Sequence, residues 1–207
     1  MNNKKGVAQF LKICYDCIIS NLMMQKGDKT MGKSNEFVKK KTVDQIVKGL
    51  LEKHNMTAPP IDISKICEDE GFTVTVGDLT KLEEETGRGE ISGVLFVREE
   101  DGDIKKDILI NNSEVPRRQR FTMAHELGHF FLHRRDGEAI ISTRNGREPE
   151  EYEADTFAAE LLMPRSMVVS RYKALLLPRA YTLANDFDVS VPAMKYRLDN
   201  LGLPYHD

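Results

Sequence analysis

Two histidines and a glutamate in the middle of the chain have the types and the spacing of a metal site. Residues 125 to 129 read H-E-L-G-H, inside an apolar run whose periodicity predicts one α-helix. On a helix, His125 and His129 leave the same face about 6 Å apart along the axis, so both imidazoles can bind one zinc ion. Glu126 projects from nearly the same side and can take a proton from a water at the open coordination position.

The setting of this motif supports its interpretation as a zinc site. An H-E-x-x-H string arises by chance about once per hundred chains of this length, so the string alone does not decide. Gly128 lets a neighbouring backbone approach the helix closely, and the flanking apolar residues would bury the helix in a core. These residues are Phe121, Ala124, Leu127, Phe131 and Leu132. A surface helix whose histidines only cap or pack would lack both features.

A second, acidic helix offers a third protein ligand. The run from 147 to 164 places Pro149 where it suits a first helical turn, with acidic residues around it. Glu151 and Asp155 lie four residues apart on this helix. One carboxylate can bind zinc, and the other can accept a hydrogen bond from the far ring nitrogen of a ligand histidine. We predict Glu151 as the ligand and Asp155 as the partner of that histidine.

Two neighbouring side chains, Glu153 and His133, must also be considered as metal ligands. Glu153 is an alternative ligand, because helix phase is not fixed by sequence; it lies about 200° round the helix from Glu151, so only one of them can face the metal. We prefer Glu151 because an acid follows it four residues later. His133 lies about 12 Å along the helix from His125, too far to share the ion. It is expected at the helix end, where it favours the dipole, or in a substrate cleft.

Three blocks of the sequence, in chain order, together resemble a known family. They read R-R-Q-R-F-T-M-A-H-E-L-G-H-F-F-L-H, then E-Y-E-A-D-T-F-A-A-E-L-L-M-P, then L-A-N-D-F-D-V-S-V-P-A-M-K-Y-R-L-D-N-L-G-L. The pattern resembles the ImmA/IrrE family of bacterial and phage metallopeptidases. An earlier stretch, P-P-I-D-I-S-K-I-C-E-D-E-G-F-T-V, is similar to that family's N-terminal helix and first strand. The resemblance covers roughly residues 43 to 203.

The resemblance implies both an activity and a set of residues. The activity is that of a zinc endopeptidase that cleaves a DNA-bound repressor of the helix-turn-helix class, relieving repression under stress or for a mobile element. Carried over by position, the metal residues are His125, His129 and Glu151, with Glu126 as the catalytic acid and base. The E-x-x-x-D arrangement of Glu151 and Asp155 is also similar to that of the wider gluzincin group.

The elements around the motif predict an α+β fold, in which a small three-stranded sheet packs beside the zinc helix and C-terminal helices follow. Helices are predicted at 43–54 and 61–70, and strands at 72–76, 91–97 and 107–111, separated by a loop at 81–90 and a turn at 99–103. The third strand ends in I-L-I-N-N just before the zinc helix. We expect it to lie along the cleft, where an extended substrate would add to the sheet.

The C-terminal region predicts three more helices. They are expected at 164–175, 179–187 and 191–201. The last two resemble a helix-turn-helix. Their candidate recognition helix carries only Lys195 and Arg197 as cations, and Asp199 offsets part of their charge. This is little positive charge for a helix that docks in the major groove of DNA. We expect this helix to pack or to dock a partner, and we do not expect direct nucleic-acid binding.

Composition divides the chain into three segments. Residues 1–34 form an N-terminal extension that ends in a Gly- and Lys-rich linker, with Met31 as an alternative start; 35–176 form a metallopeptidase domain; 177–207 form the helical pair. Cys14 and Cys17 make a lone C-x-x-C without a second pair, so a zinc ribbon or thioredoxin-like motif is not expected.

Length and charge set the class of protein. The 207 residues, 40% hydrophobic and 30% charged, suffice for one domain with a real core plus extensions. A net charge of -3 and a pI near 6.0 give no general reason to expect nucleic-acid binding. The longest apolar stretch is interrupted by Lys12 and Asp16, so it neither spans a membrane nor resembles a signal peptide. We expect a cytoplasmic protein.

The sequence therefore predicts metal-assisted peptide hydrolysis, with Zn2+ as the cofactor and a helix-turn-helix repressor as the protein substrate. The alternative is a non-catalytic regulator, or a toxin-antitoxin partner, that binds a repressor or DNA and retains zinc structurally. Glu126 argues against this alternative, because a structural site has no use for a general base and normally closes four ligands.

Overall fold

The computed structural model describes residue 19 and residues 43–133, 139–144 and 146–207. The predictions for the N-terminal extension, its linker, the alternative start at Met31 and the pair Cys14 and Cys17 lie outside these residues.

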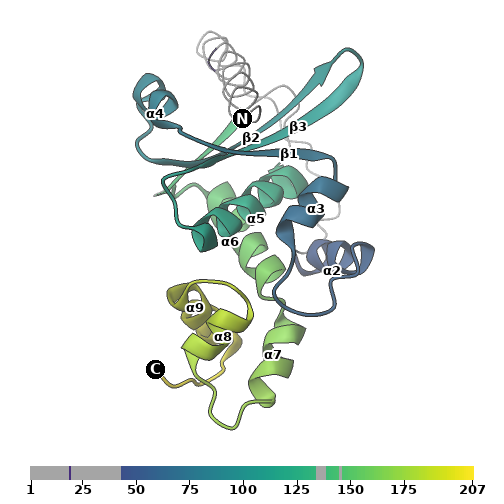
Figure 1. The fold of residues 1–207 in the computed structure, drawn as a ribbon, viewed down its shortest axis with the longest axis vertical. Helices are drawn as coiled ribbons and strands as arrows, with labels where there is room; N and C mark the ends of the chain where they lie inside the picture. Colours follow the sequence, from purple (N-terminus) through teal and green to yellow (C-terminus); the bar gives the residue numbers. More distant parts are fainter. Residues whose placement is uncertain (1–18, 20–42, 134–138, 145) are drawn as a thin grey trace, which may run out of the picture.

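A four-stranded mixed sheet forms one layer of the molecule (Figure 1). The strand order is β1-β3-β2-β4, with β1 parallel to β3 and the other two pairs antiparallel. The strands are β1 (Phe72–Gly77), β2 (Ile91–Glu100), β3 (Asp103–Asn111) and β4 (Ala139–Thr143). The α+β class is confirmed, but the prediction of three strands is wrong. The missed strand, β4, is only five residues long and reads A-I-I-S-T, too short a run to show an alternating pattern.

The position of β3 corrects a second expectation. This strand contains I-L-I-N of the I-L-I-N-N segment, to which an extended substrate was expected to add, but it lies between β1 and β2. Both of its edges are occupied by ladder hydrogen bonds, so it cannot accept another strand. The edge strands of the sheet are β1 and β4.

Eight helices lie in the part of the chain that the structure describes. All except α4 are predicted, with ends that differ by a few residues. The helix α4 replaces most of the loop expected at 81–90; its Leu82 is buried in a small cluster beside the sheet, and Gly87 ends it in the left-handed conformation. The helices are α2 (Val43–Lys53), α3 (Ile63–Asp69), α4 (Thr80–Thr86), α5 (Pro116–His133), α6 (Pro149–Leu162), α7 (Arg165–Lys173), α8 (Ala180–Asp186) and α9 (Val191–Leu201).

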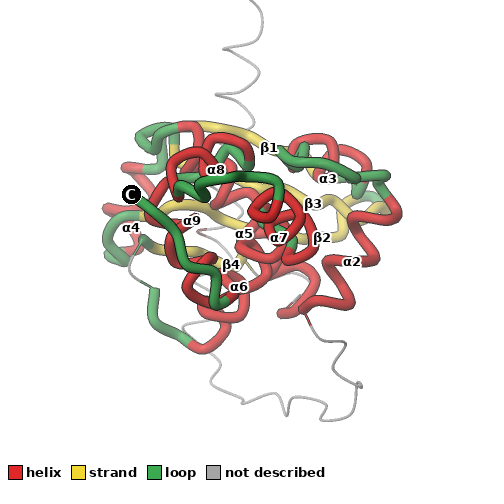
Figure 2. The backbone as a smooth tube through the Cα atoms, turned by 90° about the horizontal axis from the view of Figure 1, so that it is seen from below, coloured by secondary structure: helices red, strands yellow, loops and turns green. Residues whose placement is uncertain are grey.

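The H-E-L-G-H segment lies in the centre of the molecule. The helix α5 carries it, contacts β2 and β3, and packs against α6 (Figures 1 and 2). Leu127 is fully buried here, as its place in the apolar pattern predicted. The two helices approach closely at Gly128, where an added Cβ would lie 3.1 Å from the Ala154 Cα and 3.2 Å from the Phe157 Cβ. The expected close approach of a neighbouring backbone at Gly128 is therefore confirmed.

Replacing Gly128 by alanine is expected to destabilise the protein. The new methyl group would press against the backbone of α6, whereas the same substitution at Gly49 in α2 meets nothing within 4 Å. Alanine favours a helix by the same amount at both positions, so the difference between the two variants isolates the steric effect. We expect Gly128→Ala to be less stable than Gly49→Ala by about 1–3 kcal/mol in urea unfolding. Equal stabilities would contradict the close contact.

The C-terminal helices lie at the end of the molecule opposite the sheet (Figure 1). The helices α8 and α9 contact each other and share one buried apolar core with α5 and α6. Polar contacts also reach α5: Arg117 donates to Asn185 over 2.9 Å and pairs with Asp188 at 3.1 Å. The division of the chain at residues 176 and 177 stays a prediction. No helix of the described residues is long and apolar enough to cross a membrane.

Candidate metal centre

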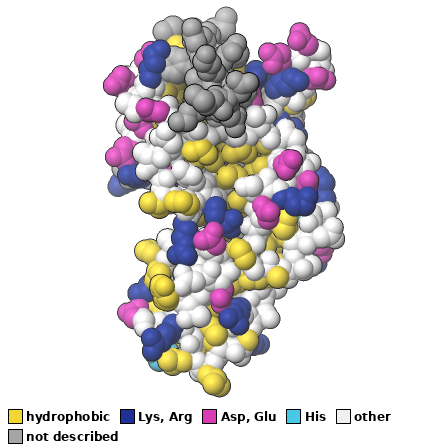
Figure 3. All heavy atoms as spheres, in the orientation of Figure 1, with side chains coloured by type: hydrophobic (Ala, Val, Ile, Leu, Met, Phe, Trp, Pro, Cys, Tyr) yellow, Lys and Arg dark blue, Asp and Glu magenta, His cyan; other side chains and the backbone are white. Residues whose placement is uncertain are grey.

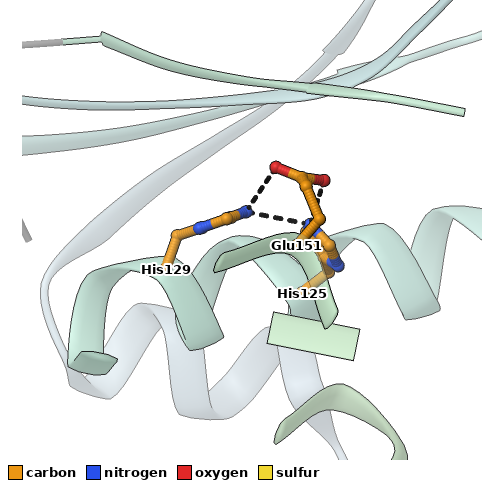
Figure 4. A group of neighbouring side chains, drawn as sticks. All are labelled: His125, His129 and Glu151. Atoms are coloured by element: carbon orange, nitrogen blue, oxygen red, sulfur yellow. Dashed lines mark hydrogen bonds and ion pairs between the residues drawn. The ribbon is translucent and has the colours of Figure 1, made fainter. Parts of the chain in front are cut away.

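Three side chains from two helices converge on one point. His125 and His129 rise from the same side of α5, and Glu151 reaches them from α6 (Figure 4). The two Nε2 atoms are 3.0 Å apart. The Glu151 carboxylate oxygens lie 3.3 Å from the His125 Nε2 and 3.2 Å from the His129 Nε2. The structure thus brings the three predicted ligands together.

The donor set and its spacing fit a zinc ion. One ligand atom from each of the three residues can be chosen so that all lie within 4.8 Å of one another, and no other group of histidine, cysteine and acidic side chains in the described residues does this. Zinc bonds of about 2.0–2.1 Å in a tetrahedral arrangement require ligand atoms about 3.3 Å apart, close to the separations found. Two imidazoles and one carboxylate, with a fourth position left open, are a ligand set of catalytic zinc sites.

Glu126 lies fully buried beside these ligands. Neither of its carboxylate oxygens has a hydrogen-bond partner in the described residues, an arrangement that is costly unless the group serves another purpose. Burial raises the pKa of this carboxyl, against the opposing charges of His125 and His129. The Ser142 hydroxyl also favours the charged form, but it does not reach hydrogen-bond geometry. The result is a carboxylate poised to accept a proton.

The backbone of β2 makes room for this carboxylate at Gly93. A Cβ at that position would lie 2.6 Å from the Glu126 Oε1 and 2.6 Å from the Thr122 Cγ2, well inside contact distance. Only a residue without a side chain therefore allows the present place of the Glu126 carboxylate. The sequence offered no signal that Gly93 would lie against the motif, because the contact between β2 and α5 is a tertiary contact.

Asp155 lies where the sequence predicted it. Its Oδ1 is 2.9 Å from the His125 Nδ1, on the side of the ring opposite Glu151. Burial acts to lower the pKa of His125, but the hydrogen bonds with Asp155 and Glu151 prevail and raise it to about 10. Burial likewise acts to raise the pKa of Glu151, and its hydrogen bonds with the two histidines lower it to about 2. Without a metal, the site is held together by a protonated His125 and an ionised Glu151.

Glu153 does not face the ligand cluster. Its Oε2 lies 2.9 Å from the Nε2 of His133, at the end of α5. His133 in turn places its Nδ1 3.2 Å from the Nδ1 of His129. The expected place of His133 at the helix terminus is confirmed, and it is not one of the three converging residues. Its contact with His129 was missed, although a spacing of four residues on a helix brings such side chains together.

A small pocket opens onto the site. It has a volume of about 190 Å³ and includes Ser142 and Thr143 of β4 besides two of the ligands. A larger pocket, of about 1130 Å³, lies between α2, α7 and α9 and contains none of the converging residues. The donor atoms, and not the size of the cavity, identify the smaller pocket as the candidate centre. Its lining residues are Ser92, Arg118, Phe121, Thr122, His125, Ser142, Thr143, Arg144, Gly146, Glu151 and Asp155.

Comparison with known proteins assigns the chain to a family. The model of the Peptidase M78 family, described as the IrrE N-terminal-like domain, matches residues 79–199, more than half of the 207 residues. The chain belongs to this family. The match contains both helices of the metal centre, so the resemblance to the ImmA/IrrE family is confirmed, and membership in this metallopeptidase family implies a bound metal ion.

Two curated proteins share part of the IrrE-like sequence. An uncharacterized immunity region protein 2 of Bacillus phage phi105 is 41% identical over 70 residues, 33% of this chain and 44% of that protein. The metallopeptidase ImmA of Bacillus subtilis is 29% identical over 96 residues, 45% of this chain and 57% of that protein. The chain thus spans about half the length of the curated relatives it matches. A solved Mycobacterium tuberculosis transcriptional regulator aligns with a TM-score of 0.49 at 16% identity, over 78% of this chain and 47% of that one.

Metal binding by this IrrE-like protein is expected to weaken as the pH falls. A pKa of about 10 keeps His125 protonated at neutral pH in the metal-free site, and an entering metal ion must displace that proton. The apparent affinity should therefore fall about tenfold for each pH unit below that pKa. Competition with a chelator of known proton affinity, between about pH 6 and pH 8, measures the slope. A flat profile would show that His125 carries no proton before the metal binds.

Proposed function

We propose that this protein is a zinc-dependent endopeptidase that hydrolyses a peptide bond in a protein substrate. His125, His129 and Glu151 are the proposed ligands, Asp155 orients His125, and Glu126 is the proposed catalytic base and acid. The observation that carries the proposal is the convergence of two Nε2 atoms and a carboxylate beside the buried Glu126, whose carboxylate has no hydrogen-bond partner among the described residues. The metallopeptidase family supports the same reading.

The proposed mechanism assigns proton transfer to Glu126. A zinc ion held by His125, His129 and Glu151 would make the attacking water more acidic and polarise the carbonyl to be cleaved. Glu126 accepts the proton of the attacking water and returns it to the leaving amine. Because this carboxylate forms no hydrogen bond within the described residues, no such bond has to be broken before it acts. The Asp155 carboxylate holds the His125 ring in the orientation that directs Nε2 at the site.

The edge strand β4 supplies a place for an extended substrate. Ser142 and Thr143 of this strand line the pocket of the metal centre. Within the described residues β4 pairs with β2 alone, and we propose that its other edge accepts the substrate as an added strand. A peptide bound there through backbone hydrogen bonds would run past the ligands with little dependence on its side chains. We therefore assign to β4 the role that the sequence had suggested for β3.

The proposed substrate is a helix-turn-helix repressor of a mobile element or a stress response. Two facts support it: one relative is named an immunity region protein of a phage, and another is named the metallopeptidase ImmA. A repressor substrate would place the activity in the cytoplasm. We also propose that residues 35–176 form the metallopeptidase domain and that the helical pair at 177–207 packs on it or docks the partner.

The contacts of α9 favour this role over DNA binding. Lys195 pairs with Asp207, and Arg197 pairs with Glu160 and donates to the Met163 carbonyl oxygen. Both cations of the candidate recognition helix are therefore engaged within the protein. On the face drawn in Figure 3, basic and acidic side chains are interspersed, without the single basic patch that phosphate binding requires.

One experiment separates the peptidase from a non-catalytic binder. The purified protein is loaded with zinc and incubated with a candidate helix-turn-helix repressor, with and without a chelator. The proposal expects repressor fragments that are absent when the chelator is present and return when zinc is restored. A stable complex with uncut repressor would favour the alternative, a regulator that acts by binding.

A further inference from the structure

We propose that His133 and Glu153 act together as positioning residues for His129, and we call this pair the His133 relay. The inference rests on the proposed function, because it takes His129 to be a metal ligand. It assigns roles to two side chains that are neither ligands nor bases in the mechanism above. The relay runs from Glu153 on α6, through His133 at the end of α5, to the far side of the His129 ring.

The contacts form a continuous chain. The Glu153 Oε2 lies 2.9 Å from the His133 Nε2, and the His133 Nδ1 lies 3.2 Å from the His129 Nδ1. The side chains of His129 and His133 are 1% and 8% exposed, whereas that of Glu153 is 42% exposed. The two rings are therefore shielded from water, while the carboxylate at the end of the chain is partly exposed to it. This arrangement avoids burying an ionised acid.

Only one arrangement of protons fits this chain with a metal bound. If the His129 Nε2 uses its lone pair to bind the ion, the proton of the neutral ring must be on Nδ1. This N–H donates to the His133 Nδ1, which is then the acceptor, so His133 carries its own proton on Nε2. That second N–H donates to the Glu153 carboxylate. Each nitrogen has one role, and the tautomer of His129 is fixed by the relay.

The relay gives the two ligand histidines equivalent support. His125 donates directly to Asp155, and His129 reaches a carboxylate through one intervening imidazole. A hydrogen bond of this kind holds the ring in place and makes the ligand nitrogen more basic. The helix α6 thus contributes one ligand, Glu151, and a carboxylate behind each histidine ligand.

Zinc affinity tests the relay with two variants of His133. In His133→Leu the acceptor for His129 is lost, while in His133→Asn an amide oxygen can take the place of Nδ1. We expect His133→Leu to weaken zinc binding by roughly 10- to 100-fold in competition with a chromophoric chelator, and His133→Asn to recover most of the loss. His206→Leu, at an exposed position near the C-terminus, is the matched control and should bind as the unaltered protein does.

Two variants of Glu153 test the outer end of the relay without touching the core. Glu153→Gln keeps an oxygen acceptor for His133, whereas Glu153→Leu removes it; Glu68→Leu, on the exposed face of α3, is the control. We expect Glu153→Leu to bind zinc more weakly than Glu153→Gln. Thermal unfolding of each metal-free variant checks that the fold is intact, because Glu153 is only partly exposed.

The tautomer of His129 gives a readout that a merely structural role would not change. Long-range proton–nitrogen spectra of the zinc-loaded protein should show the His129 proton on Nδ1, protected from exchange with water in the unaltered protein and in His133→Asn. In His133→Leu that proton should exchange faster. Unchanged zinc affinity and unchanged exchange in His133→Leu would overturn the relay while leaving the proposed peptidase intact. If the variants change zinc affinity and proton exchange as expected but the protein cuts no repressor, only the peptidase is refuted; if the protein binds no zinc, both proposals are refuted.

Discussion

Replacing Glu126 by glutamine is expected to abolish peptide-bond hydrolysis while zinc stays bound. Glutamine has nearly the same shape, so it fits the fully buried position, but its amide cannot accept the proton of the attacking water. General acid–base catalysis contributes about 10²- to 10⁴-fold, so kcat/KM should fall by at least about 100-fold. Fragment formation from the repressor measures activity, and elemental analysis of the same sample measures zinc.

Two features of the site make this test informative. The Glu126 oxygens have no hydrogen-bond partner in the described residues, so the substitution breaks no hydrogen bond there and should not unfold the helix. Glu114 offers a matched control: it is also a buried glutamate near the site, but its oxygens accept hydrogen bonds from Ser92 and Thr122. Glu114→Gln should keep far more activity than Glu126→Gln. Full turnover by Glu126→Gln would remove Glu126 from the mechanism.

Replacing His129 by alanine is expected to remove both the metal and the activity. His129 is nearly inaccessible and supplies one of the three converging donor atoms, so its loss leaves only His125 and Glu151 to hold the ion. Removing a side chain that only supports a ligand typically costs about 10- to 100-fold in metal affinity, and removing a ligand should cost more than about 100-fold. Chelator competition and elemental analysis measure the loss.

The exposed His206 provides the control for this variant. His206→Ala should retain one zinc ion per chain, since its side chain lies outside the site and is exposed. If His129→Ala kept stoichiometric zinc, the ion would be held elsewhere, and the convergence of His125, His129 and Glu151 would have another cause.

Local patterns in the sequence were sufficient to predict most of the site. The four-residue spacing of His125 and His129 fixes their common face on a helix, and the same spacing brings Asp155 to the same side of α6 as Glu151. Both regularities depend only on helix geometry, which the apolar periodicity of the two segments already indicated. For the same reason seven of the eight described helices were expected near their observed positions.

The parts that sequence did not predict depend on tertiary contacts. Which of Glu151 and Glu153 faces the histidines depends on the rotation of α6 against α5, which is set by packing around Gly128. The five-residue strand β4 is identified only by its pairing with β2. The interior place of β3 follows from the parallel pairing with β1, a contact between segments that a helix, a strand and a turn separate in the chain.

The residue at the position of Gly93 helps to identify which homologues can be active. A Cβ there would lie 2.6 Å from the Glu126 Oε1, so a larger residue would displace this carboxylate, whereas none of the three converging ligands is among the atoms that the Cβ would meet most closely. Under the mechanism proposed here, a homologue with a complete H-E-x-x-H signature but a bulkier amino acid at this strand position is expected to bind metal without hydrolysing a peptide bond. A survey that looks only for the H-E-x-x-H signature would count such proteins as hydrolases. Checking the residue that corresponds to Gly93 would distinguish them from the active members.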